Sequence, residues 1–280
     1  MTPTYHSILV HFDADAQAPA RLRQARAIAT RFGARLTTLF AVAARFVVVP
    51  VPGRPVDAPL LDEVDPASRR RAKAHFRAVE AEDGGAGVWE EADAADPVAG
   101  MAARAVYADL VVLGHADRDD LQARDVPRHF AESVVIASGT PALVLPRRHG
   151  DGAAAAEFPV VLVAWRPTAE AGRALRAALP LLGEAREVHL ASWSVDAREC
   201  QQWLDDATAW MAARGIETVR RHGHATELSG GEELLGLAAQ LGADLLVMGC
   251  YGHDRRRELV LGGVTRSVLR DASLPLLTAH

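Results

Sequence analysis

Cysteine is scarce in this sequence. Only Cys200 and Cys250 occur among its 280 residues, and neither belongs to a Cys-x-x-Cys pair. The simplest interpretation is a cytoplasmic protein with two free thiols, because disulfides persist mainly in oxidising compartments. A single bridge between the two cysteines is the alternative.

Long apolar runs and an excess of basic residues are lacking as well. No run reaches the length of about 18 residues that a transmembrane helix needs, so we expect no membrane partner. Residues 1–15 lack a basic flank and a cleavage-like site, so we expect no signal peptide. A formal net charge of −5 gives no general attraction to nucleic acid. The chain is 49% hydrophobic and 24% charged, which is typical of a globular protein.

The chain carries two copies of one pattern, which is typical of a tandem duplication. The matching segments are Ser7–Asp13 with Val160–Arg166, Ala34–Leu39 with Ala185–Leu190, Ala108–Gly114 with Ala243–Gly249, and Glu132–Pro146 with Arg266–His280. We therefore predict domains at residues 1–148 and 159–280. The segment between them, 149–158, is rich in Gly and Ala and is interpreted as a linker.

Each copy alternates short apolar runs with amphipathic stretches. In the second copy we expect strands at 160–165, 187–193, 216–221, 243–249 and 274–279, and helices at 168–182, 200–214, 232–242 and 264–272. Thr168 is a plausible N-cap, and Gly215 and Gly242 are expected to end helices. The alternation predicts an α/β fold of two doubly wound domains, each a five-stranded, mainly parallel sheet with helices on both faces.

Two further segments stand apart from this regular pattern. The first copy adds a long loop rich in Pro and Val at 43–65, which we expect either to cover a cleft or to form a contact surface. Ser229-Gly230-Gly231 is interpreted as the start of a helix. The alternative is a phosphate loop like that of ATP pyrophosphatase enzymes, although those enzymes carry the loop after the first strand.

Glycines gather after the fourth strand of the second copy. Gly249 ends that strand, Gly252 follows, and Gly262 and Gly263 precede the last helix. Bare backbone at a strand end permits the close approach of a ligand, and the unpaired N–H groups of a helix start favour an anion. Thr265 adds a hydroxyl group to this cradle. The pattern predicts a phosphate cradle, with ordinary turn glycines as the alternative.

The spacing Gly249-x2-Gly252-x9-Gly262 resembles the adenine-nucleotide motif of the universal stress protein family. The likeness covers nearly the whole chain and implies an adenine nucleotide α-hydrolase-like, Rossmann-like fold. Some members of that family bind ATP. In those members an acidic residue after the first strand contacts the adenosine, and the glycine loop holds the ribose and phosphates.

Each half departs from the family pattern. The first half keeps the acidic residue, Asp13, but His115–Asp117 and Arg128–His129 replace its glycine loop. The second half keeps the glycines but has Arg166 at the acidic position, and Gly263 where the family has Ser or Thr. An arginine cannot accept hydrogen bonds from ribose hydroxyls. We predict a nucleotide in the second domain and none in the first.

The resemblance implies a set of nucleotide-binding residues in the second domain. They are Ala164, Trp165, Arg166, Gly249, Gly252, His253, Gly262, Gly263, Val264 and Thr265. The expected ligand is ATP or another adenine nucleotide, with Mg²⁺ only as its companion ion. The alternative is a scaffold of the same fold that binds no nucleotide and serves as a stress-response interaction protein.

No catalytic residues and no metal site are predicted. No Ser-His-Asp order, paired carboxylates or metal cluster follows a strand, so any ATP hydrolysis would be slow and incidental. An enzyme of the wider adenine-nucleotide hydrolase-like group is a third alternative, which the missing catalytic set opposes. His222 and His224 are expected to be exposed or hydrogen-bonded, with half of a metal site as the alternative. His253 is a candidate for ligand contact, with an ordinary loop histidine as the alternative.

Two expectations concern packing. Trp193, Trp203 and Trp210 are interpreted as part of a packed core face around the long second helix, with a partner-binding face as the alternative. The resemblance implies that Ala142–Leu145 and Leu276–Thr278 pair across the domain interface, which would make the chain an internal pseudo-dimer. A homodimer of the whole chain is a further expectation.

Overall fold

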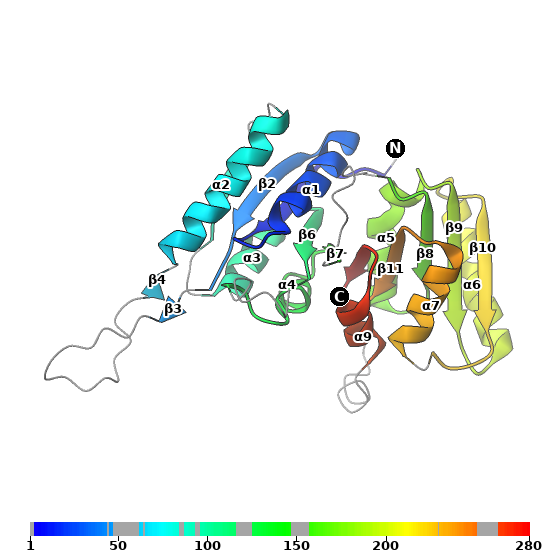
Figure 1. Ribbon diagram of the computed structural model, residues 1–280. Coiled ribbons are helices and arrows are strands. Elements are labelled where there is room, and N and C mark those ends of the chain that lie inside the picture. The colour runs from blue at the N-terminus through cyan, green and yellow to red at the C-terminus, as the bar shows by residue number, and fades with distance from the viewer. Residues whose placement is uncertain are drawn as a thin grey trace, which may run out of the picture.

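The computed structural model describes most of the chain as a single extended sheet covered by helices (Figure 1). The described residues are 3–43, 45–46, 62–63, 65–83, 87–92, 96–115, 125–146, 157–228, 230–250 and 263–280. Within them, the strands of both halves form one 10-stranded sheet in the order β10-β9-β8-β11-β12-β7-β6-β1-β2-β5. The sheet therefore runs without a break from one half to the other.

The first half contributes one end of this sheet. Its elements are β1 (Ser7–Phe12), α1 (Ala18–Phe32), β2 (Arg35–Phe40), β3 (Arg45–Phe46), β4 (Asp62–Glu63), α2 (Pro66–Asp83), β5 (Val88–Glu91), α3 (Pro97–Ala105), β6 (Leu110–Gly114), α4 (Phe130–Ser138) and β7 (Ala142–Leu145). β3 and β4 pair with each other in a separate antiparallel ribbon, which joins the two ends of the predicted insertion. Residues 47–59 of that insertion lie outside the described residues.

The second half repeats the arrangement. Its elements are β8 (Val160–Ala164), α5 (Ala169–Leu182), β9 (Glu187–Trp193), α6 (Ala197–Ala212), β10 (Val219–His224), α7 (Gly231–Leu241), β11 (Leu245–Gly249), α9 (Val264–Asp271) and β12 (Leu276–Ala279). In the first half β1 lies between β2 and β6, and in the second half β8 lies between β9 and β11 in the same way. Every neighbouring pair of sheet strands within a half is parallel. This order confirms the predicted doubly wound, five-stranded sheets.

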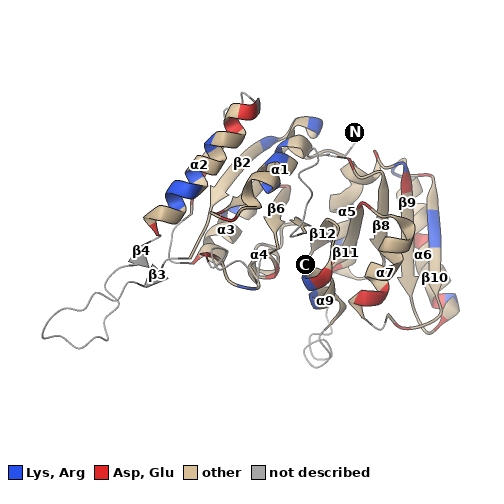
Figure 2. Cartoon of the chain, in the orientation of Figure 1, with Lys and Arg blue, Asp and Glu red and all other residues tan. Residues whose placement is uncertain are grey.

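Helices cover both faces of the sheet. Buried side chains of α1, α2, α5 and α6 share one apolar cluster, and those of α3, α4, α7 and α9 share the other. The strands between them are apolar on both sides, as β8 with the sequence VVLVA illustrates, because neither face meets water. Charged residues lie mainly on the helices, with fewer on the strands (Figure 2). Among the described residues, no helix is both long and apolar enough to cross a bilayer.

The halves meet through their last strands. β7 and β12 pair antiparallel, with Leu143 opposite Leu277, and this confirms the strand pairing that the resemblance implied. Two contacts near α5 add to the junction. The Tyr5 hydroxyl donates to the carbonyl of Ala177 at 2.6 Å, and Arg31 forms an ion pair with Glu184. The predicted domain boundaries near 148 and 159 remain predictions, because most of the linker lies outside the described residues.

Local capping explains where several helices begin and end. The Thr168 hydroxyl accepts a hydrogen bond from the amide of Ala171 at 3.2 Å, which confirms the predicted N-cap of α5. Gly215 and Gly242 follow α6 and α7 with φ of 83° and 62°. That left-handed conformation is readily available to glycine, and it lets the chain leave each helix sharply. α7 begins at Gly231 with Gly230 as its N-cap, so the predicted helix start is confirmed.

Two elements of the second half begin three residues away from their predicted starts. The strand expected at 216–221 is observed at Val219–His224, because the amide of Ile216 still bonds to Met211 in the turn that closes α6. The helix expected from residue 200 begins at Ala197, because the carboxylate of Asp196 accepts hydrogen bonds from the first-turn amides. Both differences arise from capping turns.

The interpretation of the α6 tryptophans as part of a core face holds only in part: Trp210 packs against the core cluster, but Trp203 does not belong to it, so the interpretation was wrong for Trp203. The buried face of α6 consists of Cys200, Leu204, Ala207 and Met211. Trp203 and Trp210 lie beside this face and are only partly buried, while Trp193 on β9 is buried as expected. Arginines cover both rings: the guanidinium carbon of Arg214 lies 3.7 Å from the Trp210 ring centre. Cys200 and Cys250 are both buried and free, as predicted.

Candidate functional site

The strand ends of the first half hold a buried charged cluster. Asp13, at the acidic position of the pattern, follows β1 and is 5% exposed. Its Oδ1 lies 2.9 Å from Nη2 of Arg21 on α1, while Nε of Arg21 donates to the carbonyl of His11 at 2.8 Å. Burial alone would raise the pKa of Asp13, but Arg21 and His11 together with the Asp15 amide hold it below its usual value. The carboxylate is therefore ionised and internally paired.

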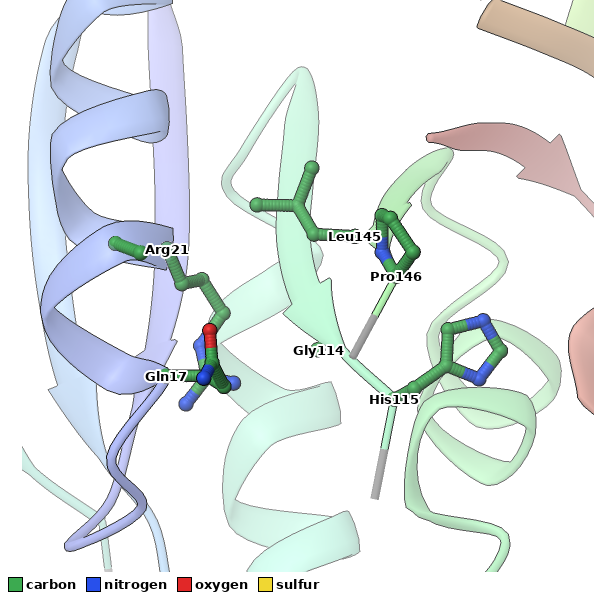
Figure 3. Close-up of a pocket in the computed structure, with 7 residues that line it drawn as sticks. Gln17, Arg21, Gly114, His115, Leu145 and Pro146 are labelled. Carbon is green, nitrogen blue, oxygen red and sulfur yellow. The ribbon is translucent and has the colours of Figure 1, made fainter. Parts of the chain in front are cut away.

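The side chain of Arg21 also occupies the space above Gly114. A Cβ placed on Gly114 would overlap Nη1 of Arg21. Figure 3 shows the small pocket that remains, which is lined by Gln17, Ala20, Arg21, Gly114, His115, Leu145 and Pro146. At the strand end where the family pattern would place a ligand, the first half thus carries a buried guanidinium of its own.

Sequence reasoning missed Arg21. The available indication was its position on the apolar face of α1, between Ala18, Leu22 and Ala25, where an arginine needs a buried partner. Asp13, eight residues earlier, is that partner. A pairing of this kind cannot be identified from one sequence, because the helix orientation decides whether the two side chains meet.

Histidine burial makes the stability of the fold dependent on pH. Burial lowers the pKa of His11 to about 4, with the nearby Arg21 acting in the same direction and Asp13 opposing it. Burial and Arg220 lower the pKa of His189, and burial and His189 lower that of His222. Folding therefore favours neutral rings, and the unfolded chain binds more protons once the pH falls below about 6.5.

We predict that the free energy of unfolding falls as the pH is lowered from about 6.5 to 4. His11 alone accounts for about 3 kcal/mol, because its pKa drops from 6.5 to about 4 on folding. Urea unfolding at several pH values measures this slope, and His11→Gln should flatten it. The expectation fails if the parent and His11→Gln lose the same stability over this range. An NMR titration of His11 in the folded parent gives its pKa directly.

In the second half, the first strand ends in a hydrogen-bonded corner. Ala164 is the last residue of β8; the amide of Trp165 donates to Ala191, and the Ser192 hydroxyl donates to the carbonyl of Trp165 at 2.9 Å. Arg166 follows on the surface, with its guanidinium carbon 5.9 Å from the centre of the Trp203 ring. The backbone of this corner is thereby fixed, and the arginine projects at the carboxyl edge of the sheet.

Gly249 has a packing role that the sequence pattern did not reveal. It ends β11, and a Cβ at this position would lie 2.5 Å from the amide nitrogen of Ala171 and 2.8 Å from the carbonyl carbon of Glu170. The first turn of α5 therefore contacts the strand backbone directly. In the first half, the same space at Gly114 is taken by the Arg21 side chain.

The last helix begins with an amide-rich turn. Gly263 is the N-cap of α9 and has no side chain to bond the first-turn amides, and Val264 and Thr265 follow it in the helix. The carbonyl of Val264 accepts from the Ser267 hydroxyl, which in turn accepts from the amide of Gly231 at 3.0 Å, so α7 and α9 are tied together.

The predicted site residues fall into two groups in the structure. Those described are Ala164, Trp165, Arg166, Gly249, Gly263, Val264 and Thr265. All of them end or follow β8 or β11, the neighbouring strands at which the strand order reverses. Thr265 is 5% exposed, which leaves little of its surface for a ligand. The predictions for Gly252, His253 and Gly262 lie outside the described residues.

Of the two histidines of β10, His222 is hydrogen-bonded as expected, whereas His224 is partly buried and its Nε2 has no hydrogen-bond partner within the described residues. Nε2 of His222 lies 2.9 Å from Nδ1 of His189, and the His224 ring stacks on Trp193 with centres 4.7 Å apart. Across the described part of the chain, no group of three or more His, Cys, Asp or Glu residues could hold a metal ion.

The chain resembles known proteins in both sequence and structure. Residues 157–280 match the family model of the universal stress protein family. A universal stress protein of Synechocystis is 57% identical over 35 residues, which is 12% of this chain and only 12% of that relative's length.

Solved structures resemble the chain over almost its full length. A universal stress protein from Archaeoglobus fulgidus is 18% identical with a TM-score of 0.71, covering 97% of this chain and 94% of the other. A protein of unknown function from Pseudomonas aeruginosa is 15% identical with a TM-score of 0.62, covering 98% and 92%. At these identities the likeness shows the fold, and it confirms the predicted α/β class.

Proposed function

Because residues 157–280 match the model of the universal stress protein family, we propose that this chain is a stress-response protein of that family that binds ATP or another adenine nucleotide in its second half. The observation that carries the proposal is the start of α9. Its N-cap is Gly263, which cannot satisfy the first-turn amides itself, and this turn follows the glycine-rich segment after β11. Unpaired amides and the helix dipole together favour a phosphate group.

The proposed site uses main-chain amides more than side chains. The amides at Gly263, Val264 and Thr265 would receive phosphate oxygens, and Gly252 and Gly262 would let the loop approach them closely. The corner formed by Ala164, Trp165 and Arg166 would meet the nucleoside end, and His253 would lie beside the ligand. Mg²⁺ would enter only with the nucleotide. Any hydrolysis of the nucleotide would be slow and incidental.

One nucleotide per chain follows from the difference between the halves. In the first half, the side chain of Arg21 fills the space above Gly114 and forms an ion pair with Asp13. Neither the backbone of Gly114 nor the carboxylate of Asp13 is therefore available to a ligand. In the second half, the position of Asp13 is taken by Arg166, which is exposed. The protein would therefore have a single ligand site. In this proposal it acts in the cytoplasm as an internal pseudo-dimer, alone or as a homodimer.

A scaffold that binds no nucleotide is the second candidate function. Two observations favour it: Arg166 replaces the acidic residue, and Gly249 is already required by the packing of α5. Mass spectrometry of small molecules released from freshly purified, denatured protein separates the two functions. A co-purifying adenine nucleotide supports the first, whereas its absence together with no binding of added ATP supports the scaffold.

We predict that Gly263→Asp abolishes nucleotide binding while leaving α9 intact. The aspartate would cap the first-turn amides, and its negative charge would repel a phosphate at the same place. The backbone at Gly263 has φ of −42°, so the substitution does not demand a left-handed conformation. Isothermal titration with ATP should show a loss of binding of at least about a hundredfold, because a charge contact and several hydrogen bonds are lost.

Gly230→Asp is the matched control for this experiment. Gly230 is the N-cap of α7, also has no side-chain cap, and has no heavy atom within 4 Å of an added Cβ. It should leave ATP binding unchanged. Equal binding by the parent and Gly263→Asp would show that the start of α9 does not hold the phosphates.

A further inference from the structure

Arg166 differs in chemistry and surroundings from its counterpart in the first half. Asp13 is buried and paired with Arg21, whereas Arg166 is exposed at the end of β8. Within the part of the chain that the structure describes, its guanidinium makes no ion pair and lies over the Trp203 ring at 5.9 Å. A ring face at that distance holds the cation loosely and leaves its N–H groups available.

The acidic side chains of the flanking helices are engaged elsewhere. Glu170, in the first turn of α5, lies 3.3 Å from Arg173. Glu199, in the first turn of α6, accepts a hydrogen bond from the Ser194 hydroxyl at 2.7 Å, and Asp196 caps the same helix. Arg166 is therefore a positive group at the carboxyl edge of the sheet with the capacity to bind an external anion.

The exchange of a carboxylate for a guanidinium changes which ligand group fits. A carboxylate accepts hydrogen bonds from free ribose hydroxyls, whereas a guanidinium donates two parallel hydrogen bonds to a phosphate. In dinucleotide-binding α/β folds, the same exchange separates ligands with a free ribose hydroxyl from ligands with a phosphate on it. Arg166 follows β8, and α9 is the helix that follows the neighbouring strand β11. The arginine and the proposed phosphate cradle at α9 therefore lie after the two adjacent strands at which the strand order of the sheet reverses.

We propose that the second half binds an adenine nucleotide that carries a phosphate on its ribose ring in addition to its 5′-phosphate, and that Arg166 recognises this ribose phosphate. The inference rests on the nucleotide site proposed above and names the ligand class of that site. The start of α9 receives the 5′-phosphate end, and Arg166 receives the phosphate at the 2′ or 3′ oxygen.

The test compares ligands that carry the same number of phosphates in different places. ADP, adenosine 3′,5′-bisphosphate and adenosine 2′,5′-bisphosphate are titrated into the full-length protein by calorimetry. One of the two bisphosphates should bind at least about tenfold more tightly than ADP. Arg166→Ala should weaken that bisphosphate about tenfold to a hundredfold and leave ADP unchanged, and Arg166→Asp should reverse the preference.

Arg176→Ala is the matched control. Arg176 lies on α5 and its guanidinium carbon is also 5.9 Å from a tryptophan ring centre, that of Trp210. This variant should keep the preference of the parent. If ADP and both bisphosphates bind the parent equally, or if Arg166→Ala weakens all three alike, the role of Arg166 is overturned while the nucleotide site stands. If the parent binds none of them and no ATP, the nucleotide site itself is overturned.

Discussion

Replacing Gly249 with alanine should destabilise the protein by about 3 kcal/mol or more. The added Cβ would lie 2.5 Å from the nitrogen and 2.9 Å from the Cα of Ala171, closer than such atoms can approach. These are backbone atoms in the first turn of α5, so relief requires the helix to move away from β11. Overpacking of this kind costs a few kcal/mol in well-packed interiors. Urea unfolding followed by circular dichroism measures the loss.

Gly236→Ala is the matched control and should have the opposite sign. Gly236 lies inside α7, is exposed, and has nothing within 4 Å of an added Cβ. Alanine in a helix interior is favoured over glycine by about 0.5–1 kcal/mol, so this variant should be slightly more stable than the parent. If Gly249→Ala is as stable as the parent, the close contact with α5 does not restrict this position.

This pair of variants also separates two roles that one sequence motif combines. A glycine at a strand end suits a ligand and suits a closely packed helix equally well, and the spacing of Gly249 and Gly252 cannot distinguish them. The structure assigns Gly249 to helix packing. The case for a ligand therefore depends on Gly263 and on the start of α9, where a cap is missing.

The fold could be predicted from the sequence because its determinants are local or repeated. The apolar runs at β8 and β11 fit strands buried on both faces, and Thr168 and Gly242 mark helix ends through their own capping chemistry. The internal repeat then indicated that both halves have the same strand order. Where capping turns competed with strand propensity, as at Ile216, the predicted boundary shifted by three residues.

The candidate site could be predicted only in part, because its contacts join residues from different elements. The equivalence of Gly114 and Gly249 is visible in the repeat, but their neighbours differ: an arginine side chain covers one and a helix backbone covers the other. Whether Arg21 meets Asp13 depends on how α1 is rotated on the sheet, which periodicity fixes only approximately. The same holds for Arg166, whose contact with Trp203 depends on the placement of α6.

The two halves should unfold together in the parent protein, and Leu143→Asp should separate them. Leu143 on β7 is fully buried and pairs with Leu277 on β12, so an aspartate would place an unpaired carboxylate at the junction. Burying such a charge costs about 3–5 kcal/mol, which is comparable with the total stability of many domains. Because the ten strands form one sheet, this substitution should lower the stability of the first half and also weaken its coupling to the second half.

Two optical signals distinguish joint from separate unfolding. Four of the five tryptophans lie in the second half, so their fluorescence reports mainly on that half, whereas circular dichroism reports on both. In urea the two signals should change together for the parent and apart for Leu143→Asp, because coincident transitions indicate a single cooperative unit. Val106→Asp, at a position 57% exposed in the first half, should change the stability by about 0.5 kcal/mol or less and keep the signals coincident. Separate transitions in the parent would mean that the β7–β12 pair does not couple the halves and that they are two independently stable domains in contact. Coincident transitions in Leu143→Asp would mean that contacts other than the β7–β12 pair couple the halves.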